Sequence, residues 1–250
     1  MAELLAAAAD IPLAGPPIAL VVPHAGTMFS GAVAATGFRQ LTAGEVRRVF
    51  LIGPSHRLVF AGAALWAGAG FGTPLGEVPV DREAGSAMLA AGSEVIAVKN
   101  LAHDDEHALE VELPFLQQWL GGFTLVPLLM GRQDATTATR LAQVLAQVVR
   151  PQNGDLVIAS SDLSHYHPYA EAVALDHLAL ARVAELDPEG FLAGLGERRF
   201  EACGGGPIAV ALLAARWLGG RTAAILDYQN SGDVTGDREQ VVGYAACAVS

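Results

Sequence analysis

The sequence predicts a single α/β domain over residues 1–250, a three-layer α/β/α sandwich with a mostly parallel central sheet. Six apolar, β-rich runs are continuous rather than alternating, which is typical of strands covered on both faces. Helix-like segments lie between most of them, and strand–helix alternation indicates a largely parallel sheet. We find no internal repeat, low-complexity tract or linker, so one domain is the simplest interpretation.

The strands are predicted from their apolar runs, which begin with "IALVV" and "RVFLIG" near the N-terminus. In chain order they cover residues 18–22, 48–53, 123–130, 155–160, 222–228 and 241–249. The last two follow each other without a helix between them. This succession predicts a hairpin-like, mixed portion of the sheet at the C-terminal end.

The helices are predicted from caps, breakers and apolar spacing. They cover residues 31–41, 81–91, 104–120, 135–149, 168–186 and 206–220. Asp81 is a plausible N-cap, and Pro168 is acceptable in a first helical turn. Gly219 and Gly220 make a good stop for the last helix. Residues 135–149 place apolar side chains at i, i+3, i+4 and i+7, while Pro114 kinks the third helix or starts a second one.

Composition excludes several classes of protein. The net charge is −11 and the 15 lysines and arginines are scattered, so we expect no nucleic-acid partner. Mean hydropathy is +0.38, yet no run is long enough to span a membrane. The N-terminus lacks the basic region of a secretory signal. Two cysteines make no disulfide framework, so we expect a cytoplasmic protein.

Three predicted strands each end in a loop that carries a histidine. His24, His56 and His165 follow the first, second and fourth strands, and Asp162 lies in the same loop as His165. A single histidine at such a place is more often a structural one. Because ligands of open α/β sheets bind beyond the carboxyl ends of strands, three at matching positions indicate one shared site. Imidazole is both a common metal ligand and a common acid/base group.

Cys203 precedes three glycines and the start of a predicted helix. A small buried hydrophobe is the plain interpretation of a free cysteine. A helix start, however, favours the thiolate, and the glycines permit close approach of a ligand, so we interpret Cys203 as functional. Cys247 lies in the last apolar strand and is expected in the core.

Residues 104–120 place His107 and Glu110 one turn apart on one predicted helix face. From spacing alone, a solvated helix face and a wall of the site are equally good interpretations. There is no second histidine for an HExxH zinc site. We expect His103 and His177 at the surface.

Six motifs together resemble the Memo family, in the family's order and over nearly the whole chain. They are "PHAG…SG" (23–31), "GPSH" (53–56), "EHALEVELPFLQ" (106–117), "SSDLSHY" (160–166), "CGGGPI" (203–208) and "YQNSGDVTGDREQVVGYAA" (228–246). The resemblance implies a fold like that of the class III extradiol ring-cleaving dioxygenases. It also implies an association with two partners, a radical-SAM protein and a third small protein.

The resemblance also implies a metal site. It places His24 and His56 on the two histidine ligand positions of those dioxygenases, and Cys203 where they have glutamate. Iron as Fe²⁺ is the implied metal, with copper as the alternative, and the small-molecule substrate is not specified. His165 takes the acid/base position.

Two further residues receive roles from the resemblance, and two positions depart from the family's pattern. Asp162 lies beside the acid/base position, and His107 would line the same pocket. Thr27 and Phe29 stand where the family often has tyrosine or another aromatic residue, which alters the expected pocket lining. Thiolate in place of carboxylate changes the metal preference, because thiolate is softer and donates more charge.

Three functions follow as alternatives. The first is a redox-active or dioxygenase-like metalloenzyme with His24, His56 and Cys203 as ligands. The second is a metal-free hydrolase or transferase in which Cys203 attacks and His165 is the base. The third is a binding module on a vestigial dioxygenase scaffold, which recognises a small ligand or a partner protein.

Overall fold

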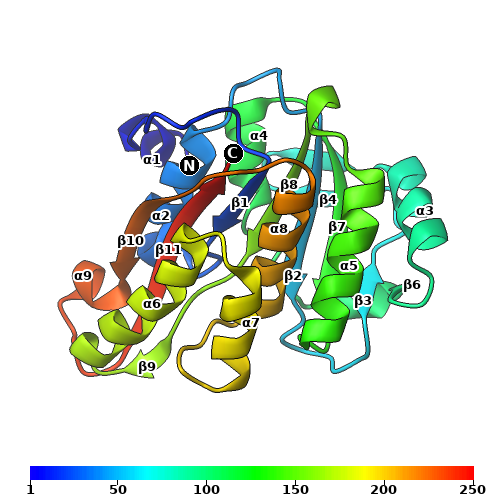
Figure 1. The fold of residues 1–250 in the computed structure, drawn as a ribbon. Helices are drawn as coiled ribbons and strands as arrows, with labels where there is room; N and C mark the ends of the chain where they lie inside the picture. Colours follow the sequence, from blue (N-terminus) through cyan, green and yellow to red (C-terminus); the bar gives the residue numbers. More distant parts are fainter.

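A mixed sheet forms the centre of the computed structural model, which describes residues 1–250 (Figure 1). The strands are β1 (Ala19–Val22), β2 (Arg48–Pro54), β3 (Ala63–Leu65), β4 (Gly70–Thr73), β5 (Gly76–Pro79), β6 (Ile96–Val98), β7 (Thr124–Met130), β8 (Asp155–Ser160), β9 (His165–His167), β10 (Ala223–Asn230) and β11 (Val241–Val249). The order across the sheet is β10-β11-β1-β8-β2-β7-β3-β6, and β9 adds to β11. Strands β4 and β5 form a separate hairpin.

The central strands β1, β8, β2 and β7 all run parallel, so their carboxyl ends meet at one edge of the sheet. On one side, β11 pairs antiparallel with β1 and with β10. This confirms the hairpin-like portion predicted at the C-terminal end. On the other side, β3 pairs antiparallel with β7 and parallel with β6.

Helices cover both faces of the sheet, which confirms the three-layer α/β/α prediction (Figure 1). They are α1 (Ala2–Ala7), α2 (Thr27–Arg39), α3 (Arg82–Ala91), α4 (Leu113–Leu120), α5 (Ala135–Val148), α6 (Tyr169–Ala184), α7 (Pro188–Gly196), α8 (Gly205–Trp217) and α9 (Ser231–Thr235), with 3₁₀ turns at Asn100–Ala102 and Pro151–Asn153. Helices α1, α2 and α4 pack on one face, and α3, α5, α6, α7 and α8 pack on the other.

The continuous apolar strands are explained by this double covering. In β2, Phe50 and Ile52 belong to the core under α5 and α8, whereas Val49 and Leu51 belong to the core under α2 and α4. Because successive side chains of a strand point to opposite faces, both sets must be apolar. Asp81 caps α3 as predicted, since its carboxylate accepts a hydrogen bond from the Ala84 amide.

The prediction of one helix over residues 104–120 is wrong for its first half. Residues 104–112 form turns, and helix α4 begins at Leu113 with Pro114 in its first turn. The Glu106 side chain accepts hydrogen bonds from the Ala108 and His56 amides, which are contacts that a regular helix would not make. Tertiary contacts to the neighbouring loop therefore override the local helix pattern. Asp105, at φ 56°, also leaves the helical region.

The surface prediction for His103 is also wrong, because this residue is buried. Its Nε2 lies 3.1 Å from the Ala64 carbonyl oxygen, and its ring packs against Trp66 and Phe71. His177 is exposed, as expected. The short strands β3 to β6 and β9 were not predicted, since three or four residues carry too little periodic signal.

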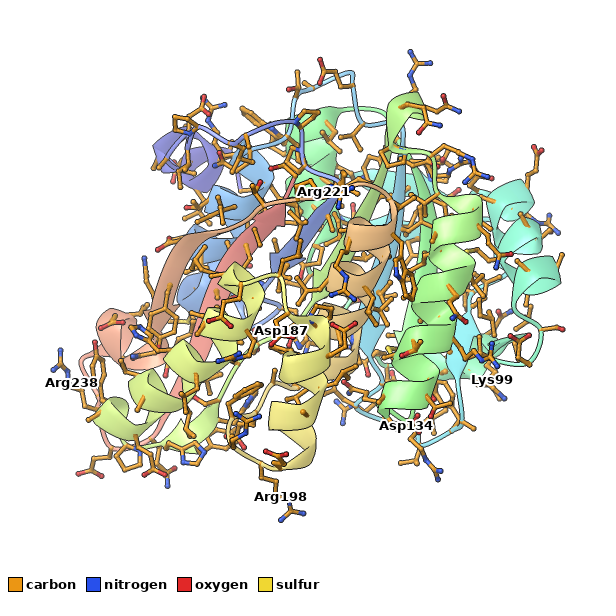
Figure 2. All side chains as sticks on the ribbon, in the orientation of Figure 1. Lys99, Asp134, Asp187, Arg198, Arg221 and Arg238 are labelled. Carbon is orange, nitrogen blue, oxygen red and sulfur yellow. The ribbon has the colours of Figure 1, made fainter.

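Charged side chains project from the outer surface of the molecule, as Lys99, Arg198 and Arg238 illustrate in Figure 2. Among the helices, none combines the length and the apolar character that crossing a bilayer requires.

Candidate functional site

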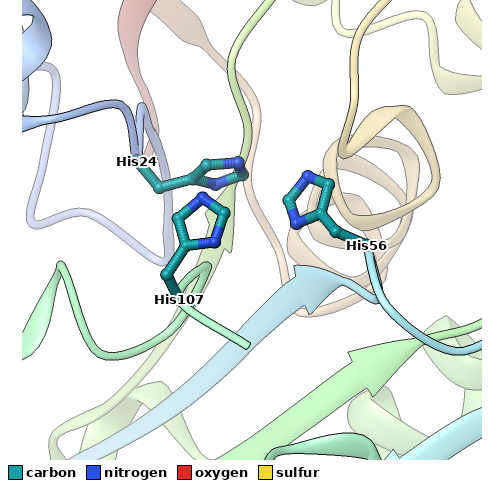
Figure 3. Close-up of side chains that lie close together, drawn as sticks. All are labelled: His24, His56 and His107. Atoms are coloured by element: carbon teal, nitrogen blue, oxygen red, sulfur yellow. The ribbon is translucent and has the colours of Figure 1, made fainter. Parts of the chain in front are cut away.

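Three histidines from separate loops converge at the carboxyl edge of the sheet. His24 follows β1, His56 follows β2, and His107 comes from the turns of residues 104–112. Their ring centroids lie 5.3 Å (His24 and His56), 5.6 Å (His24 and His107) and 5.1 Å (His56 and His107) apart. Figure 3 shows the three rings turned toward a common point.

In two groups of three side chains, one donor atom from each residue lies within 4.8 Å of a donor atom from each of the others. One group is His24, His56 and His107, and the other is His24, Asp162 and Cys203. The Cys203 sulfur lies 3.3 Å from His24 Nε2. His24 belongs to both groups, so it is the side chain that joins the imidazole cluster to the thiol.

His24 is almost fully buried, at 2% exposure, and a contact at one ring nitrogen fixes its orientation. Its Nδ1 lies 2.7 Å from Ser160 Oγ, at the end of β8. Burial, and then the charges of His56 and His107, lower the pKa of His24 from 6.5 to about 3. The ring is therefore neutral at physiological pH and retains a lone pair for a cation.

Glu106 orients the second histidine, and sequence reasoning gave this residue no role. Its carboxylate lies 2.9 Å from His56 Nδ1 and accepts a hydrogen bond from the His56 amide at 2.6 Å. Burial opposes ionisation of this carboxyl group, but hydrogen bonds from His56 and Ala108 outweigh burial and lower its pKa to about 2. Glu106 is thus an anion beside His56. His107 Nδ1 lies 3.5 Å from Glu106 Oε1, the oxygen that also contacts His56 Nδ1.

Asp162 lies against the His24 loop, not against an imidazole ring. Its Oδ1 accepts hydrogen bonds from the amides of His24 (2.9 Å) and Ala25 (3.2 Å). Burial raises the pKa of Asp162 to about 7. These contacts place the Asp162 carboxyl group in the wall of the site, where it holds the backbone of the His24 loop.

Cys203 is held by contacts on both sides of its loop. The Asp162 amide donates a hydrogen bond to its sulfur at 3.2 Å, and the Gln133 side chain donates to its carbonyl oxygen at 2.8 Å. At Gly204, a Cβ atom would lie 2.5 Å from the Ser160 carbonyl oxygen, so only glycine fits there. Burial, followed by the Asp162 charge, raises the pKa of the Cys203 thiol to about 12.

His165 lies at the start of β9 and is partly buried. Its Nδ1 donates a hydrogen bond to the Leu163 carbonyl oxygen at 2.8 Å, which leaves Nε2 available. His167 instead makes ion pairs with Glu171 and Glu201, at 3.2 and 2.6 Å, and takes no part in the cluster.

Sequence reasoning assigned no role to three buried polar residues behind the ligands, namely Glu106, Glu112 and Ser160. Glu106 and Glu112 lie in an acidic stretch of the sequence, and this composition is indistinguishable from that of a solvated turn. Ser160 is the first polar residue after the apolar run of β8. That position is the one signal that points to this end of the strand.

Comparison with known proteins supports the family resemblance. A family model described as "Memo-like protein" matches residues 9–248. A "MEMO1 family protein" from Aeropyrum pernix is 41% identical over 236 residues, covering 93% of this chain and 83% of the relative. A second, from Sulfolobus acidocaldarius, is 39% identical and covers 90% of this chain and 79% of the relative.

A solved structure shares the fold. It is that of an uncharacterized Escherichia coli K12 protein, which is similar with a TM-score of 0.62 and 14% sequence identity. The match covers 92% of this chain and 98% of that chain, so nearly the whole architecture is common to both.

Proposed function

Because this chain belongs to the Memo family, we propose that it binds one iron or copper ion and uses that ion for redox chemistry on a small-molecule substrate. His24, His56 and Cys203 are the proposed ligands, and His107 adds an imidazole beside them. The observation that carries the proposal is the position of His24, a side chain that belongs both to the imidazole group and to the thiol group.

The hydrogen bonds around the rings fit a metal site. Ligating histidines normally engage their second ring nitrogen with a carboxylate, carbonyl or other protein group, which fixes the ring. Here His24 Nδ1 contacts Ser160, and His56 Nδ1 contacts Glu106. Each ring therefore keeps Nε2 as the free donor, and the neutral form of His24 needs no deprotonation before it binds a cation.

The donor set combines borderline imidazole nitrogens with one soft sulfur. Such a set suits iron, copper or zinc better than magnesium or calcium. Iron is the first expectation, and copper is the alternative. When bound, the metal would supply one-electron redox chemistry, and a cation at this place would also deprotonate the thiol.

The remaining residues would handle protons and exclude solvent. His165 Nε2 is free because Nδ1 donates to the Leu163 carbonyl, so this ring can accept a proton from a substrate. His107 is half exposed at the mouth of the site, where a substrate would meet it first. Asp162 keeps the His24 loop closed over the thiol through its two amide contacts.

The metal-free hydrolase is the weaker alternative. A nucleophilic cysteine needs a thiolate, and burial raises the pKa of Cys203 to about 12, so the thiol stays protonated at neutral pH. The imidazole within hydrogen-bonding distance of the sulfur is His24, and its pKa of about 3 makes it a weak base.

A binding role has one supporting observation. Exposed apolar side chains lie within four residues of the histidines: Met28 in the first turn of α2, Val59 in the loop after β2 and Tyr166 in β9, which are 72%, 94% and 69% exposed. An apolar rim of this kind suits a partner surface or an apolar substrate. We retain a radical-SAM protein and a third small protein as proposed partners for this rim.

Metal analysis tests the proposal. The chain is purified anaerobically, reconstituted with Fe(II) or Cu(I), and its bound metal is measured by mass spectrometry. We expect one equivalent in the wild type and in His177→Ala, an exposed control, and loss of that equivalent in His24→Ala, His56→Ala and Cys203→Ala. Wild-type metal content in all three variants would refute the proposed metal site. Binding of a partner protein by the metal-free chain would favour the binding module.

A further inference from the structure

One hydroxyl group connects His24 to a fully buried carboxyl group. Ser160 Oγ lies 2.7 Å from each of three atoms: His24 Nδ1, the Ala108 carbonyl oxygen and Glu112 Oε1. Ser160 and Glu112 are both 0% exposed. These contacts are too short for oxygen and nitrogen atoms without a proton between them, so each must contain one hydrogen.

The protons can be counted. A serine hydroxyl has one hydrogen and two acceptor lone pairs, so it donates once and accepts twice. The Ala108 carbonyl oxygen has no hydrogen and can only accept. The single hydrogen of Ser160 must therefore point to Ala108, and the other two contacts must be donated to Ser160 by His24 and by Glu112.

This assignment fixes two protonation states. Glu112 can donate only as a carboxylic acid, with its hydrogen on Oε1. His24 can donate from Nδ1 only if that nitrogen carries a ring hydrogen. The ring is 2% exposed and its nitrogens contact Ser160 and Cys203 but no carboxylate, so it carries one hydrogen and the lone pair is on Nε2. His24 Nε2 is the atom that lies 3.3 Å from the Cys203 sulfur.

The surroundings of Glu112 agree with a neutral acid. No ion pair includes Glu112, and its Oε2 is buried without a hydrogen-bond partner. An ionised carboxylate in that position would be unpaired in a low-dielectric interior, which is costly, whereas a carbonyl oxygen of a neutral acid loses far less. Burial correspondingly raises the pKa of Glu112 well above its usual value.

We propose that Glu112 is a neutral carboxylic acid and that Glu112 and Ser160 are positioning residues, which hold His24 in the tautomer with hydrogen on Nδ1 and a lone pair on Nε2. The tautomer follows from the metal-free contacts alone. Its value for metal binding rests on the proposed function, because a cation needs the Nε2 lone pair.

Spectroscopy of the metal-free full-length chain tests both protonation states. Infrared difference spectra between wild type and Glu112→Gln should contain the carbonyl stretch of a protonated carboxylic acid at neutral pH. Nitrogen-15 NMR should show the hydrogen of His24 on Nδ1. Glu110→Gln, a change at an exposed carboxylate two residues away, should leave both signals as in wild type.

The variants separate positioning from simple packing. Glu112→Gln keeps a donor to Ser160 through its amide, so the His24 tautomer and the affinity for Fe(II) or Cu(I) should stay within about threefold of wild type. Ser160→Ala and Glu112→Leu should yield a mixed His24 tautomer and weaken metal affinity by roughly 10- to 100-fold, as loss of an orienting partner does elsewhere.

Two results would overturn the proposal. One is a carboxylate band for Glu112 at neutral pH, together with a metal affinity that falls when Glu112→Gln removes the charge. The other is a His24 ring with its hydrogen on Nε2 in wild type. If the spectra agree but no metal binds to any form, the proposed function fails while this assignment stands.

Discussion

The two edges of the central parallel strands differ in whether their polar side chains are paired with opposite charges. At the amino edge, Arg48 begins β2 beside Asp155, which begins β8. The guanidinium donates to both Asp155 oxygens, at 3.0 and 2.9 Å, and to Asp81 at 3.0 Å. At the carboxyl edge, His24 and Cys203 have no charged partner of their own, and their donor atoms face each other.

The difference separates a structural charge cluster from a candidate site. Each charge at the amino edge meets its opposite, so removing one partner leaves the others unpaired and destabilises the fold. At the carboxyl edge, burial has kept His24 neutral and the thiol protonated, so no charge is lost when one of them is removed. Mutations at the first edge should therefore change stability, and mutations at the second should change binding.

The largest expected effect is at the amino edge. Arg48→Ala leaves Asp155, whose side chain is 2% exposed, without its bidentate partner. Breaking a buried pair costs about 3 to 5 kcal/mol, and because Arg48 is partly exposed we expect a loss of about 3 kcal/mol. Urea unfolding measures the loss, and metal content should stay at the wild-type value. A loss below about 0.5 kcal/mol would remove the distinction between the edges.

A pH effect of similar size is expected from His103, which is buried outside the site. Burial lowers its pKa from 6.5 to about 4. The unfolded chain therefore binds this proton first as pH falls, so the contribution to stability is complete above pH 6.5 and is lost as pH falls through about 4. The loss amounts to roughly 3 kcal/mol at about 1.4 kcal/mol for each pKa unit.

Unfolding measured between neutral and acidic pH checks this prediction, with His103→Gln as the variant that cannot titrate. The glutamine amide keeps a donor for the Ala64 carbonyl, so the variant should show a flatter stability profile over the same range. Identical slopes in the two proteins would show that His103 is not the group responsible. Metal binding should not change, because His103 takes no part in either donor group.

The next effect is at the carboxyl edge. Glu106→Gln removes the anion that faces His56 Nδ1, so we expect metal affinity to fall by roughly 10- to 100-fold. We also expect a stability loss of about 1 kcal/mol, smaller than that of Arg48→Ala, because the His56 and Ala108 amides donate to different oxygens of Glu106 and glutamine offers only one acceptor oxygen. A competitive chelator titration gives the affinity. A large loss of stability with unchanged metal affinity would contradict the claim that mutations at the carboxyl edge act mainly on binding.

The smallest effect is a helix cap beside the site. Asp134 accepts a hydrogen bond from the Thr137 amide at 2.8 Å and caps α5, next to Gln133. Asp134→Ala should cost about 1 kcal/mol, as lost caps usually do, and should leave metal affinity unchanged. Thermal unfolding with a parallel metal titration tests both statements, and a weakened site would show that this end of α5 contributes to binding.

The long elements of the fold could be predicted from the sequence because their signals are local. The apolar residues 156–159 are bounded by Asp155 and Ser160, and further polar residues follow at once, so β8 was placed with its observed bounds. The helix prediction for residues 104–112 failed because their conformation depends on the contact between Glu106 and His56. These residues are fifty positions apart, so no local pattern contains the contact. The surface prediction for His103 failed for the same reason, since its burial depends on packing against Trp66 and Phe71.

The candidate site divides along the same line. His24 and His56 were found because each follows a strand directly, and Cys203 because glycines and a helix start follow it. The roles of Ser160 and Glu112 could not be found, because both depend on which atoms meet behind His24. The identity of a ligand's neighbours is a property of the folded chain, and a single sequence does not encode it in any local spacing.

The most direct test of the central claim is an anaerobic crystal structure of the chain soaked with Fe(II) or Cu(I), with anomalous diffraction measured at the metal edge. We predict one anomalous peak bound by His24, His56 and the Cys203 sulfur, at the carboxyl edge of the sheet. No peak there under conditions in which surface carboxylates bind the metal would contradict the account.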